Sequence, residues 1–356
     1  MDQSYLSELK RLSGPILITG HTGFKGAWLT QVLQKLGISV VGLSLPALEG
    51  SLYKRAKMLG QIPEIFGDIC DVNVVMKAMT EFKPSAVIHM AAQPLVLESY
   101  SFPRKTFETN VMGTVNLLDA AVNCASVGAT VVITTDKVYK NPNTATRFSE
   151  GDSLGGKDPY SASKSAAEMA VTAWQHMSQL REGAPVISVR AGNVIGGGDW
   201  SQDRLLPDLV KGFHEGKEVT VRNPKSTRPW QHVIDPLQGY LMALNEMLKG
   251  NLEDSLNFGP IERSLSVEEV VKIVRTSWPS DTEVVFQQSD NKSESVTLEL
   301  GSLRARDSLG WKPVWSQEEA VIFTIKWWDL VLNRGTHPLE ACNLDIEHFI
   351  EQVSNR

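Results

Sequence analysis

Residues Ile16-Leu17-Ile18-Thr19-Gly20-His21-Thr22-Gly23-Phe24-Lys25-Gly26 form the stretch that decides the fold. Its apolar start predicts a short buried strand, and the apolar residues of 28–36 recur at helix spacing. Glycines between a strand and a helix permit a tight turn and let the backbone approach a pyrophosphate, which the amides of the helix N-terminus would bind. A plain turn is the alternative explanation, but the place of these glycines before an amphipathic helix favours dinucleotide binding.

The same alternation of strand and helix continues along the first half of the chain. Short apolar runs rich in β-branched residues predict further strands at 40–43, 86–89, 131–133 and 186–189. Strands that alternate with helices predict an α/β fold built on a Rossmann-type doubly wound parallel sheet.

The character of the sequence changes after about residue 196. The stretch 196–200 is glycine-rich and predicts a loop, whereas 256–259 predicts one more strand that returns to the sheet. We therefore assign 1–195 plus about 231–259 to a dinucleotide-binding domain. A smaller α/β substrate-binding lobe would take 196–230 plus 260–356.

The composition argues against several classes of protein. The formal net charge of −6 disfavours a nucleic-acid or anionic-membrane partner, which would require a basic face. Cys70, Cys124 and Cys342 are odd in number and widely spaced, so neither a disulfide framework nor a metal site is expected. We see no signal-peptide pattern and no apolar run of membrane-spanning length. These features predict a soluble, cytoplasmic protein.

The second motif is Asp158-Pro159-Tyr160-Ser161-Ala162-Ser163-Lys164. Asp158 is suited to cap a helix and Pro159 to begin it, which places Tyr160 and Lys164 one turn apart on the same face. A free phenol titrates near pH ~10, and a neighbouring ammonium and the positive helix end would both favour its phenolate. An ordinary helix start is the alternative explanation. Because a glycine loop lies upstream, we interpret Tyr160 and Lys164 as a catalytic pair.

The third motif is Thr134-Thr135-Asp136-Lys137-Val138-Tyr139, which follows the predicted strand at 131–133. Polar residues just beyond the carboxyl end of a parallel strand face the crevice where ligands bind. A solvated loop explains this spacing equally well, so the motif alone decides nothing.

One expected residue is missing. An acid about 20 residues beyond the glycine loop usually holds the ribose 2′-hydroxyl of NAD. Here Ser44 stands at that position, and no arginine follows at once to favour the 2′-phosphate of NADP. We therefore favour NAD and leave NADP open.

Taken in order, these motifs resemble the extended short-chain dehydrogenases/reductases, the NAD-dependent epimerase/dehydratase family. The order continues through Gly67-Asp68-Ile69 and His89-Met90-Ala91-Ala92-Gln93. Narrower segments at 154–160, 190–200 and 228–233 resemble the CDP-glucose 4,6-dehydratases within that family, and the likeness extends over roughly 14–350. The dTDP-glucose dehydratases carry Asp-Glu where this chain has Asp136-Lys137.

The resemblance implies a role for each residue at a matching position. For NAD it implies Gly20, His21, Gly23, Phe24, Gly26, Ser44, Asp68, Ile69, Ala91, Ala92, Gln93, Asn110, Tyr160 and Lys164. For catalysis it implies Thr135, Tyr160 and Lys164 as a triad, joined by Asp136 and Lys137 for dehydration. For a nucleotide-sugar substrate it implies Asn193, Arg204 and Arg228, since arginine forks suit a diphosphate. It also implies a homodimer or a dimer of dimers.

The implied reaction turns a nucleotide-linked glucose into its 4-keto-6-deoxy derivative by C4 oxidation, loss of water across C5 and C6, and return of hydride to C6. Asp136 would be the acid, while Lys137 would be either the C5 base or a cation that stabilises the enolate. A 4-epimerase or 4-reductase, or a dehydratase for another nucleotide hexose, is the second interpretation. Epimerases and reductases need Tyr160 and Lys164 but not Asp136-Lys137. Ser293-Glu294-Ser295 departs from the His-Glu-Ala run common in the family, so the nucleotide base stays open.

Overall fold

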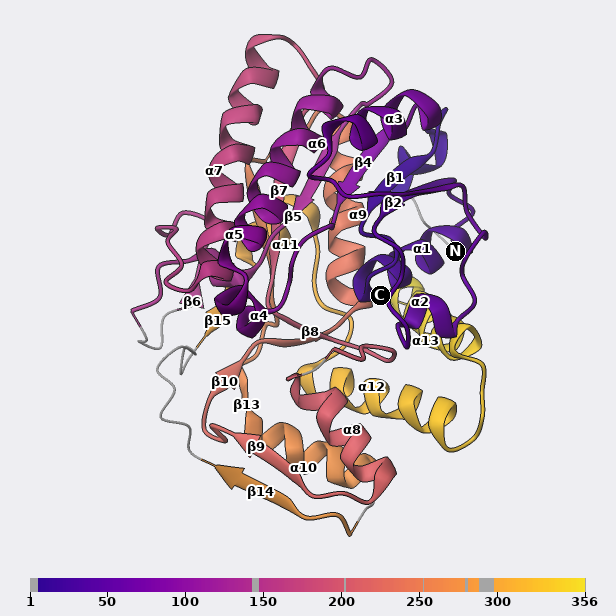
Figure 1. Cartoon of the computed structure of the whole chain (residues 1–356), viewed down its shortest axis with the longest axis vertical. Helices are drawn as coiled ribbons and strands as arrows, with labels where there is room; N and C mark the ends of the chain where they lie inside the picture. Colours follow the sequence, from indigo (N-terminus) through magenta and orange to yellow (C-terminus); the bar gives the residue numbers. More distant parts are fainter. Residues whose placement is uncertain are drawn as a thin grey trace.

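A computed structural model of the protein describes residues 6–142, 147–201, 203–251, 253–278, 281–287 and 298–355. A seven-stranded sheet lies at its centre, with the strands in the order β12-β7-β5-β4-β1-β2-β3 and all pairs parallel (Figure 1). Its strands are β1 (Ile16–Thr19), β2 (Val40–Ser44), β3 (Glu64–Phe66), β4 (Ala86–His89), β5 (Thr130–Ile133), β7 (Val186–Ala191) and β12 (Ser255–Phe258). This order confirms the predicted Rossmann-type sheet.

Helices cover both faces of the sheet. Successive side chains of each strand point to opposite faces, so a strand can contribute to hydrophobic clusters on both sides. In β1, Ile16 and Ile18 join one hydrophobic cluster while Leu17 joins another. The helices α3 (Val72–Phe82), α6 (Gly113–Val122) and α7 (Pro159–Leu180) pack side by side over one face (Figure 1). The other face is covered by α1 (Phe24–Lys35) and α9 (Ile234–Leu248).

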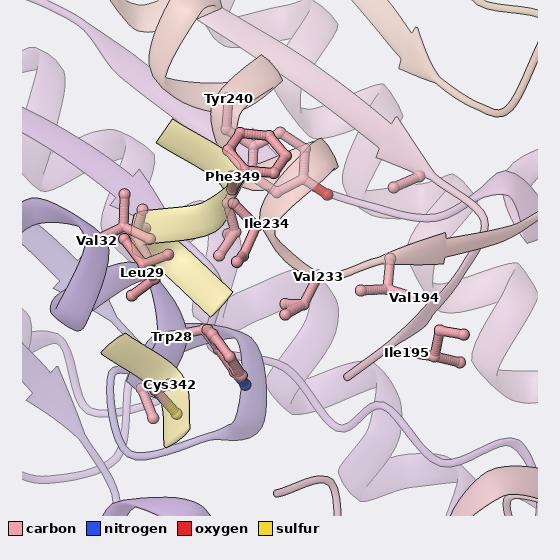
Figure 2. Close-up of a cluster of buried hydrophobic side chains, with 14 of the residues drawn as sticks. Trp28, Leu29, Val32, Val194, Ile195, Val233, Ile234, Tyr240, Cys342 and Phe349 are labelled. Atoms are coloured by element: carbon pink, nitrogen blue, oxygen red, sulfur yellow. The ribbon is translucent and has the colours of Figure 1, made fainter. Parts of the chain in front are cut away.

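The C-terminal helix α13 (Pro338–Ser354) returns to α1. Figure 2 shows Trp28 and Leu29 of α1 in one buried cluster with Ile234 of α9 and Cys342 of α13. The division of the chain into a cofactor domain and a substrate lobe remains a prediction, although α13, assigned to the lobe, packs against the cofactor domain.

The remaining elements build the lobe below the sheet and the short connections around it (Figure 1). Four two-stranded pairs are β6 (Arg147–Phe148) with β15 (Glu299–Leu300), β8 (Asn193–Ile195) with β11 (Trp230–His232), β9 (Val219–Arg222) with β14 (Val284–Gln287), and β10 (Thr227–Arg228) with β13 (Leu265–Ser266). The helices are α2 (Leu52–Arg55), α4 (Val96–Ser101), α5 (Pro103–Phe107), α8 (Leu205–Glu215), α10 (Val267–Ser277), α11 (Leu303–Leu309) and α12 (Gln317–Leu332). Shorter turns are η2 (Leu9–Arg11), the π-helical η3 (Glu108–Met112) and η4 (Asp136–Val138). Ser293-Glu294-Ser295 lies outside the described residues.

The predicted glycine-rich loop at 196–200 is packed tightly between the two parts of the molecule. The indole Nε1 of Trp28 donates to the carbonyl of Gly197 at 3.0 Å. A Cβ atom on Gly197 would lie 1.9 Å from the ring of Trp327 in α12, so only glycine fits there. Trp200 extends this packing, and the centroid of its ring lies 4.3 Å from the centroid of the Trp328 ring. Among the described residues, no helix is long and apolar enough to cross a membrane.

Candidate active site

The glycine loop runs from the end of β1 into α1, as predicted. Gly20 has φ +76°, and a Cβ there would lie 2.8 Å from the amide nitrogen of Ala91. Gly23 is the N-cap residue of α1, and Phe24 and Gly26 fall in the first turn of that helix. The loop therefore lies against the backbone of Ala91 and presents the N-terminus of α1, an arrangement that fits the pyrophosphate of a dinucleotide.

Asn110 joins the segment after β4 to the catalytic helix. Its Oδ1 accepts from the amide of Gln93 at 2.8 Å, and its Nδ2 donates to the Gln93 carbonyl at 3.1 Å. The same Nδ2 donates to Ser163 Oγ in α7 at 2.9 Å. Asn110 is 1% exposed and lies in η3, where a π-turn displaces it from regular helix geometry. Ala91, Ala92 and Gln93 are thereby held in a fixed position relative to Tyr160.

Two residues predicted to bind NAD, Ser44 and His21, lie near β2 and β3. Ser44 is buried and forms a 2.7 Å hydrogen bond with Thr22 Oγ1; because Thr22 donates to the Leu45 carbonyl, Ser44 is the donor. His21 lies under the sheet edge, with Nε2 2.9 Å from Glu64 Oε2. The hydroxyl of Ser44 and the Nε2 of His21 are therefore both engaged within the protein.

Asp68 and Ile69 follow β3. The Asp68 carboxylate accepts from Lys105 Nζ at 2.9 Å and from the Cys70 amide, which together hold its pKa below the usual range despite partial burial. Ile69 is buried against Gly113, where a Cβ would lie 2.4 Å from Ile69 Cδ1. Asp68 and Ile69 are thus fixed between β3 and α3, with Ile69 packed against the first residue of α6.

Tyr160 and Lys164 lie one turn apart at the start of α7, as predicted. Asp158 caps this helix through a 2.9 Å hydrogen bond from the amide of Ser161, and Pro159 is its first residue. Lys164 Nζ donates to the carbonyl of Ile133, the last residue of β5, at 2.9 Å. Burial lowers the pKa of Lys164 to about 8, while the Glu168 carboxylate opposes that shift.

The environment of Tyr160 differs from the sequence expectation. Burial raises the pKa of Tyr160 to about 12, and the neighbouring Thr135 hydroxyl opposes that rise. We expected Lys164 to favour the phenolate, but its ammonium group is directed to the Ile133 carbonyl. In this structure the phenol is therefore held neutral by burial.

Thr135 is the N-cap residue of η4, the short turn after β5 that contains Asp136 and Lys137. Thr135 Oγ1 donates to Asp136 Oδ1 at 3.0 Å, and it accepts from the Lys137 amide at 3.4 Å. Asp136 is 1% exposed, and its Oδ2 has no hydrogen-bond partner among the described residues. Burial raises the pKa of Asp136, while Lys137 and Thr135 oppose the shift. The Lys137 ammonium lies 6.0 Å from the centre of the Tyr160 ring.

Of the predicted substrate residues, Arg204 and Arg228 lie within 196–230, whereas Asn193 lies in β8. Arg204 at the start of α8 donates to Asp199 at 3.0 Å, and its charge also lowers the pKa of Tyr160. Arg228 in β10 lies near enough to Asp136 to lower the pKa of that carboxyl group. The backbone amide of Asn193 donates to the Pro229 carbonyl at 3.1 Å. This hydrogen bond aligns β8 with β11, close to Arg228 in the sequence. The charges of both arginines thus act on predicted site residues, Arg204 on Tyr160 and Arg228 on Asp136.

Two residues of the site were not singled out from the sequence. Lys25 Nζ lies 3.4 Å from the hydroxyl of Tyr240 in α9, 215 positions away in sequence. Burial, reinforced by the charges of Arg204 and Lys164, lowers the pKa of Lys25 to about 7. A lysine inside a glycine loop was a visible signal for Lys25, whereas Tyr240 lies in an apolar helix and gave none.

A scan against protein-family models matches residues 16–259 to the NAD dependent epimerase/dehydratase family. The chain belongs to this family. Membership in the NAD dependent epimerase/dehydratase family accounts for the glycine loop and the Tyr160/Lys164 pair together. Among the described residues, no three His, Cys, Asp or Glu side chains converge as metal ligands.

Curated relatives narrow the likeness within the epimerase/dehydratase family. The chain is 39% identical over 321 residues to a CDP-glucose 4,6-dehydratase of Salmonella typhimurium strain LT2, covering 88% of this chain and 89% of that one. It is 26% identical over 332 residues to a dTDP-glucose 4,6-dehydratase of Xanthomonas campestris pv. campestris strain B100, covering 88% of this chain and 92% of the other.

Solved structures of other proteins share the fold. A UDP-glucose 4-epimerase of Thermus thermophilus in complex with NAD superposes with a TM-score of 0.77 at 26% identity, covering 88% of this chain and 98% of that one. A dTDP-glucose 4,6-dehydratase of Streptomyces venezuelae reaches the same TM-score, 0.77, at 23% identity, covering 91% and 99%. The epimerase and the dehydratase therefore have the same architecture, and the choice between their reactions depends on the site residues.

Proposed function

We propose that the protein is an NAD-dependent CDP-glucose 4,6-dehydratase, a hydro-lyase that forms CDP-4-keto-6-deoxyglucose and water. The observation that carries the proposal is Asp136, a buried carboxyl group whose Oδ2 has no partner among the described residues and which lies beside Thr135. An epimerase or reductase has no step that needs such an acid, whereas a dehydratase must protonate the departing C6 hydroxyl. The 39% identity to a CDP-glucose 4,6-dehydratase supports the nucleotide.

The proposed steps assign one task to each residue. Tyr160 removes the proton from the C4 hydroxyl, Thr135 orients that hydroxyl, and Lys164 stabilises the phenolate by its charge. A bound NAD would supply the hydride acceptor for oxidation at C4. Asp136 donates its proton to the C6 hydroxyl as water leaves, and its raised pKa suits an acid. Lys137 acts in the same step, either as the C5 base or as a cation facing the enolate.

NAD and the substrate would bind to different sets of residues. We assign the pyrophosphate of NAD to Gly20, Gly23 and Gly26 with the first turn of α1, and the remainder of NAD to the residues near β2, β3 and β4. We assign the substrate diphosphate to Arg204 and Arg228, with Asn193 beside them. Arginine forks bind phosphate oxygens in pairs, which favours this assignment over that of an isolated surface charge.

The test is a comparison of CDP-, dTDP-, UDP- and GDP-glucose with the purified protein and NAD. We expect a 4-keto-6-deoxy sugar, detected by the near-ultraviolet absorbance that such sugars develop in alkali, with the highest kcat/KM for CDP-glucose. Tyr160→Phe serves as the inactive control. Conversion of any of these sugars to its galactose isomer without a keto sugar would contradict the proposed dehydratase activity. A preference for another nucleotide sugar would contradict the proposed CDP specificity.

We also propose that two copies associate through the helices that cover one face of the sheet. Large apolar side chains are exposed there, with Tyr100 49% exposed on α4 and Met169 55% exposed on α7. Phe102, Phe107 and Met112 extend the same surface along α5 and η3. These exposed apolar side chains lie on elements that pack against one another, which favours association. Light scattering should give a dimer or tetramer, and Met169→Glu should shift it towards the monomer.

A cytoplasmic location is the last part of the proposal. The three cysteines are free, which suits a reducing compartment. Cell fractionation should recover the protein with cytoplasmic markers.

A further inference from the structure

His89 belongs to a motif of the sequence, but the proposed reaction gives it no task. It is the last residue of β4, it directly precedes the segment assigned to NAD, and it is 2% exposed. Both ring nitrogens are engaged, since Nδ1 lies 2.6 Å from Thr19 Oγ1 and Nε2 lies 3.0 Å from Thr114 Oγ1. The ring therefore joins the last residue of β1 to the second residue of α6.

The hydrogen bonds of Thr114 determine which ring nitrogen carries a proton. Thr114 Oγ1 lies 2.7 Å from the carbonyl oxygen of Asn110 and must donate to it, because a carbonyl oxygen has no proton. The single hydroxyl proton of Thr114 is thereby used. Thr114 can only accept from His89, so Nε2 of the ring is protonated.

The hydrogen bonds of Thr19 determine the state of the other ring nitrogen. Thr19 Oγ1 accepts from the backbone amides of Met90 and Ala91, each at 3.2 Å. These two donors occupy both lone pairs of the hydroxyl, so its proton is directed to His89 Nδ1, which must be bare. Burial, with a smaller contribution from the charge of Lys164, lowers the pKa of His89 to about 3, in agreement with a neutral ring.

The resulting chain of hydrogen bonds runs in one direction across the cofactor domain. It begins at the amide of Ala91, which donates to Thr19, the residue directly before the glycine loop. It continues from Thr19 through the His89 ring to Thr114. It ends at the carbonyl of Asn110 in η3.

Asn110 extends this connection to the catalytic tyrosine. Its Nδ2 donates to Ser163 Oγ at 2.9 Å, and Ser163 Oγ donates to the carbonyl of Tyr160 at 2.7 Å. A displacement of Asn110 would therefore be passed to the residue assigned as the C4 base. Misplacement of a reacting group by ~1 Å can lower a rate by ~10²-fold.

We infer that His89 is a positioning residue, whose neutral ring fixes the NAD-binding turn at Ala91 relative to Tyr160. This rests on the proposed function, which assigns Ala91 to NAD and Tyr160 to the C4 hydroxyl. The two ring nitrogens have different tasks. Nδ1, through Thr19, supports the turn that binds NAD, whereas Nε2, through Thr114, supports the alignment of Tyr160.

The first experiment uses the free protein labelled with ¹⁵N-histidine. The chain has seven histidines, and the ring signals absent from His89→Gln identify His89. We expect Nε2 to be protonated and Nδ1 to be bare, without a change near pH ~6.5, where a free imidazole titrates. A proton on Nδ1 in place of Nε2, or titration of this ring near pH ~6.5, would overturn the inference.

The second experiment removes the hydrogen bonds of one ring nitrogen at a time. His89→Asn retains an acceptor near the position of Nδ1, and His89→Gln retains a donor near the position of Nε2. In equilibrium titration we expect His89→Gln to raise the Kd for NAD roughly tenfold, with little change in His89→Asn. With saturating NAD and CDP-glucose, we expect the single-turnover rate of cofactor reduction to fall by roughly tenfold or more in His89→Asn and much less in His89→Gln.

Thr114→Val is the matched control for the Nε2 side, because it removes the acceptor and leaves the ring intact. It should reproduce His89→Asn, and the two substitutions combined should be no slower than either alone. Equal effects of His89→Asn and His89→Gln on both quantities, or further slowing in the combined variant, would reduce the ring to a packing role and overturn the inference. If wild type reduces no cofactor with any nucleotide-linked glucose, the proposed function fails instead, and the ¹⁵N spectra and NAD affinities still test the link.

Discussion

Arg190 and Glu168 form a buried ion pair, with Arg190 Nη2 2.7 Å from Glu168 Oε2 and both side chains at most 5% exposed. Glu168 lies one turn beyond Lys164 on α7, and Arg190 lies in β7. Thr134 and Ser188 add hydrogen bonds to the same carboxylate, so no charge is left unpaired. The catalytic helix is thereby joined to the sheet directly beneath Lys164.

Arg190→Met should destabilise the fold by about 3–5 kcal/mol, because it leaves the Glu168 carboxylate buried without its partner. Urea denaturation followed by circular dichroism would measure the loss. The control is Arg104→Ala, which breaks the exposed pair with Glu108 and should change stability by no more than about 0.5 kcal/mol. A similar small change in both variants would mean that packing, not the ion pair, holds α7 to the sheet.

The pH dependence of kcat/KM should have an alkaline limb near the Lys164 pKa of about 8. Lys164 is charged below that pH and neutral above it, so the positive charge that it gives the site is lost as the pH rises. Glu168→Gln removes the charge that raises the Lys164 pKa, and the limb should therefore move to lower pH. The limb should remain in Lys25→Met. Its loss in that variant would assign the titration to Lys25.

Tyr160→Phe should lower kcat by at least the ~10²-fold expected for loss of an acid–base group. The ring and its packing remain, so NAD should still bind with near-normal affinity in equilibrium titration. Activity close to that of wild type would exclude Tyr160 as the C4 base.

Asp136→Asn should separate oxidation from dehydration. The amide keeps the shape of the carboxyl group but has no acidic proton, while Tyr160 and Lys164 are untouched. In a single turnover with CDP-glucose we expect reduced cofactor to accumulate, seen by its near-ultraviolet absorbance, without 6-deoxy product. If cofactor reduction is blocked as completely as in Tyr160→Phe, Asp136 serves the first step instead.

Ser44→Asp should sharpen the preference for NAD over NADP, because a carboxylate there would repel the 2′-phosphate and accept from the ribose hydroxyl. A hydrogen bond to a charged group contributes about 1.5–3 kcal/mol, which corresponds to a change of roughly tenfold or more in the ratio of the two dissociation constants. Ser44→Ala is the control, since Ser44 donates only to Thr22 in this structure, and its ratio should stay near that of wild type. An unchanged ratio in Ser44→Asp would place ribose recognition elsewhere.

The sheet and the catalytic helix could be predicted because their signals are local. Each of the strands β1, β2, β4, β5 and β7 contains an apolar run, β12 alternates polar and apolar residues, and the cap and first residue of α7 are adjacent in sequence. The strand β3 was missed because it lies at the sheet edge, where Glu64 and Ile65 are only partly buried and Phe66 is exposed. Two-residue strands such as β10 are too short for any periodicity.

One contact of the site that escaped prediction is long-range. Lys25 meets Tyr240 across 215 positions. Nothing in either local sequence specifies such a partner. The burial that raises the pKa of Tyr160 is likewise set by the packed lobe, so the motif alone pointed in the opposite direction.

The filled space around Gly197 has a consequence for how the molecule moves. A hinge requires a few residues whose torsions can change freely, and Gly197 is fixed by the Trp28 indole on one side and the Trp327 ring on the other. The chain therefore cannot pivot at Gly197, and we expect ligands to enter without a hinge motion at this position. A larger side chain at Gly197 would separate Trp28 from Trp327 and weaken the packing between α1 and α12. We therefore expect the single cooperative unfolding transition to split into two.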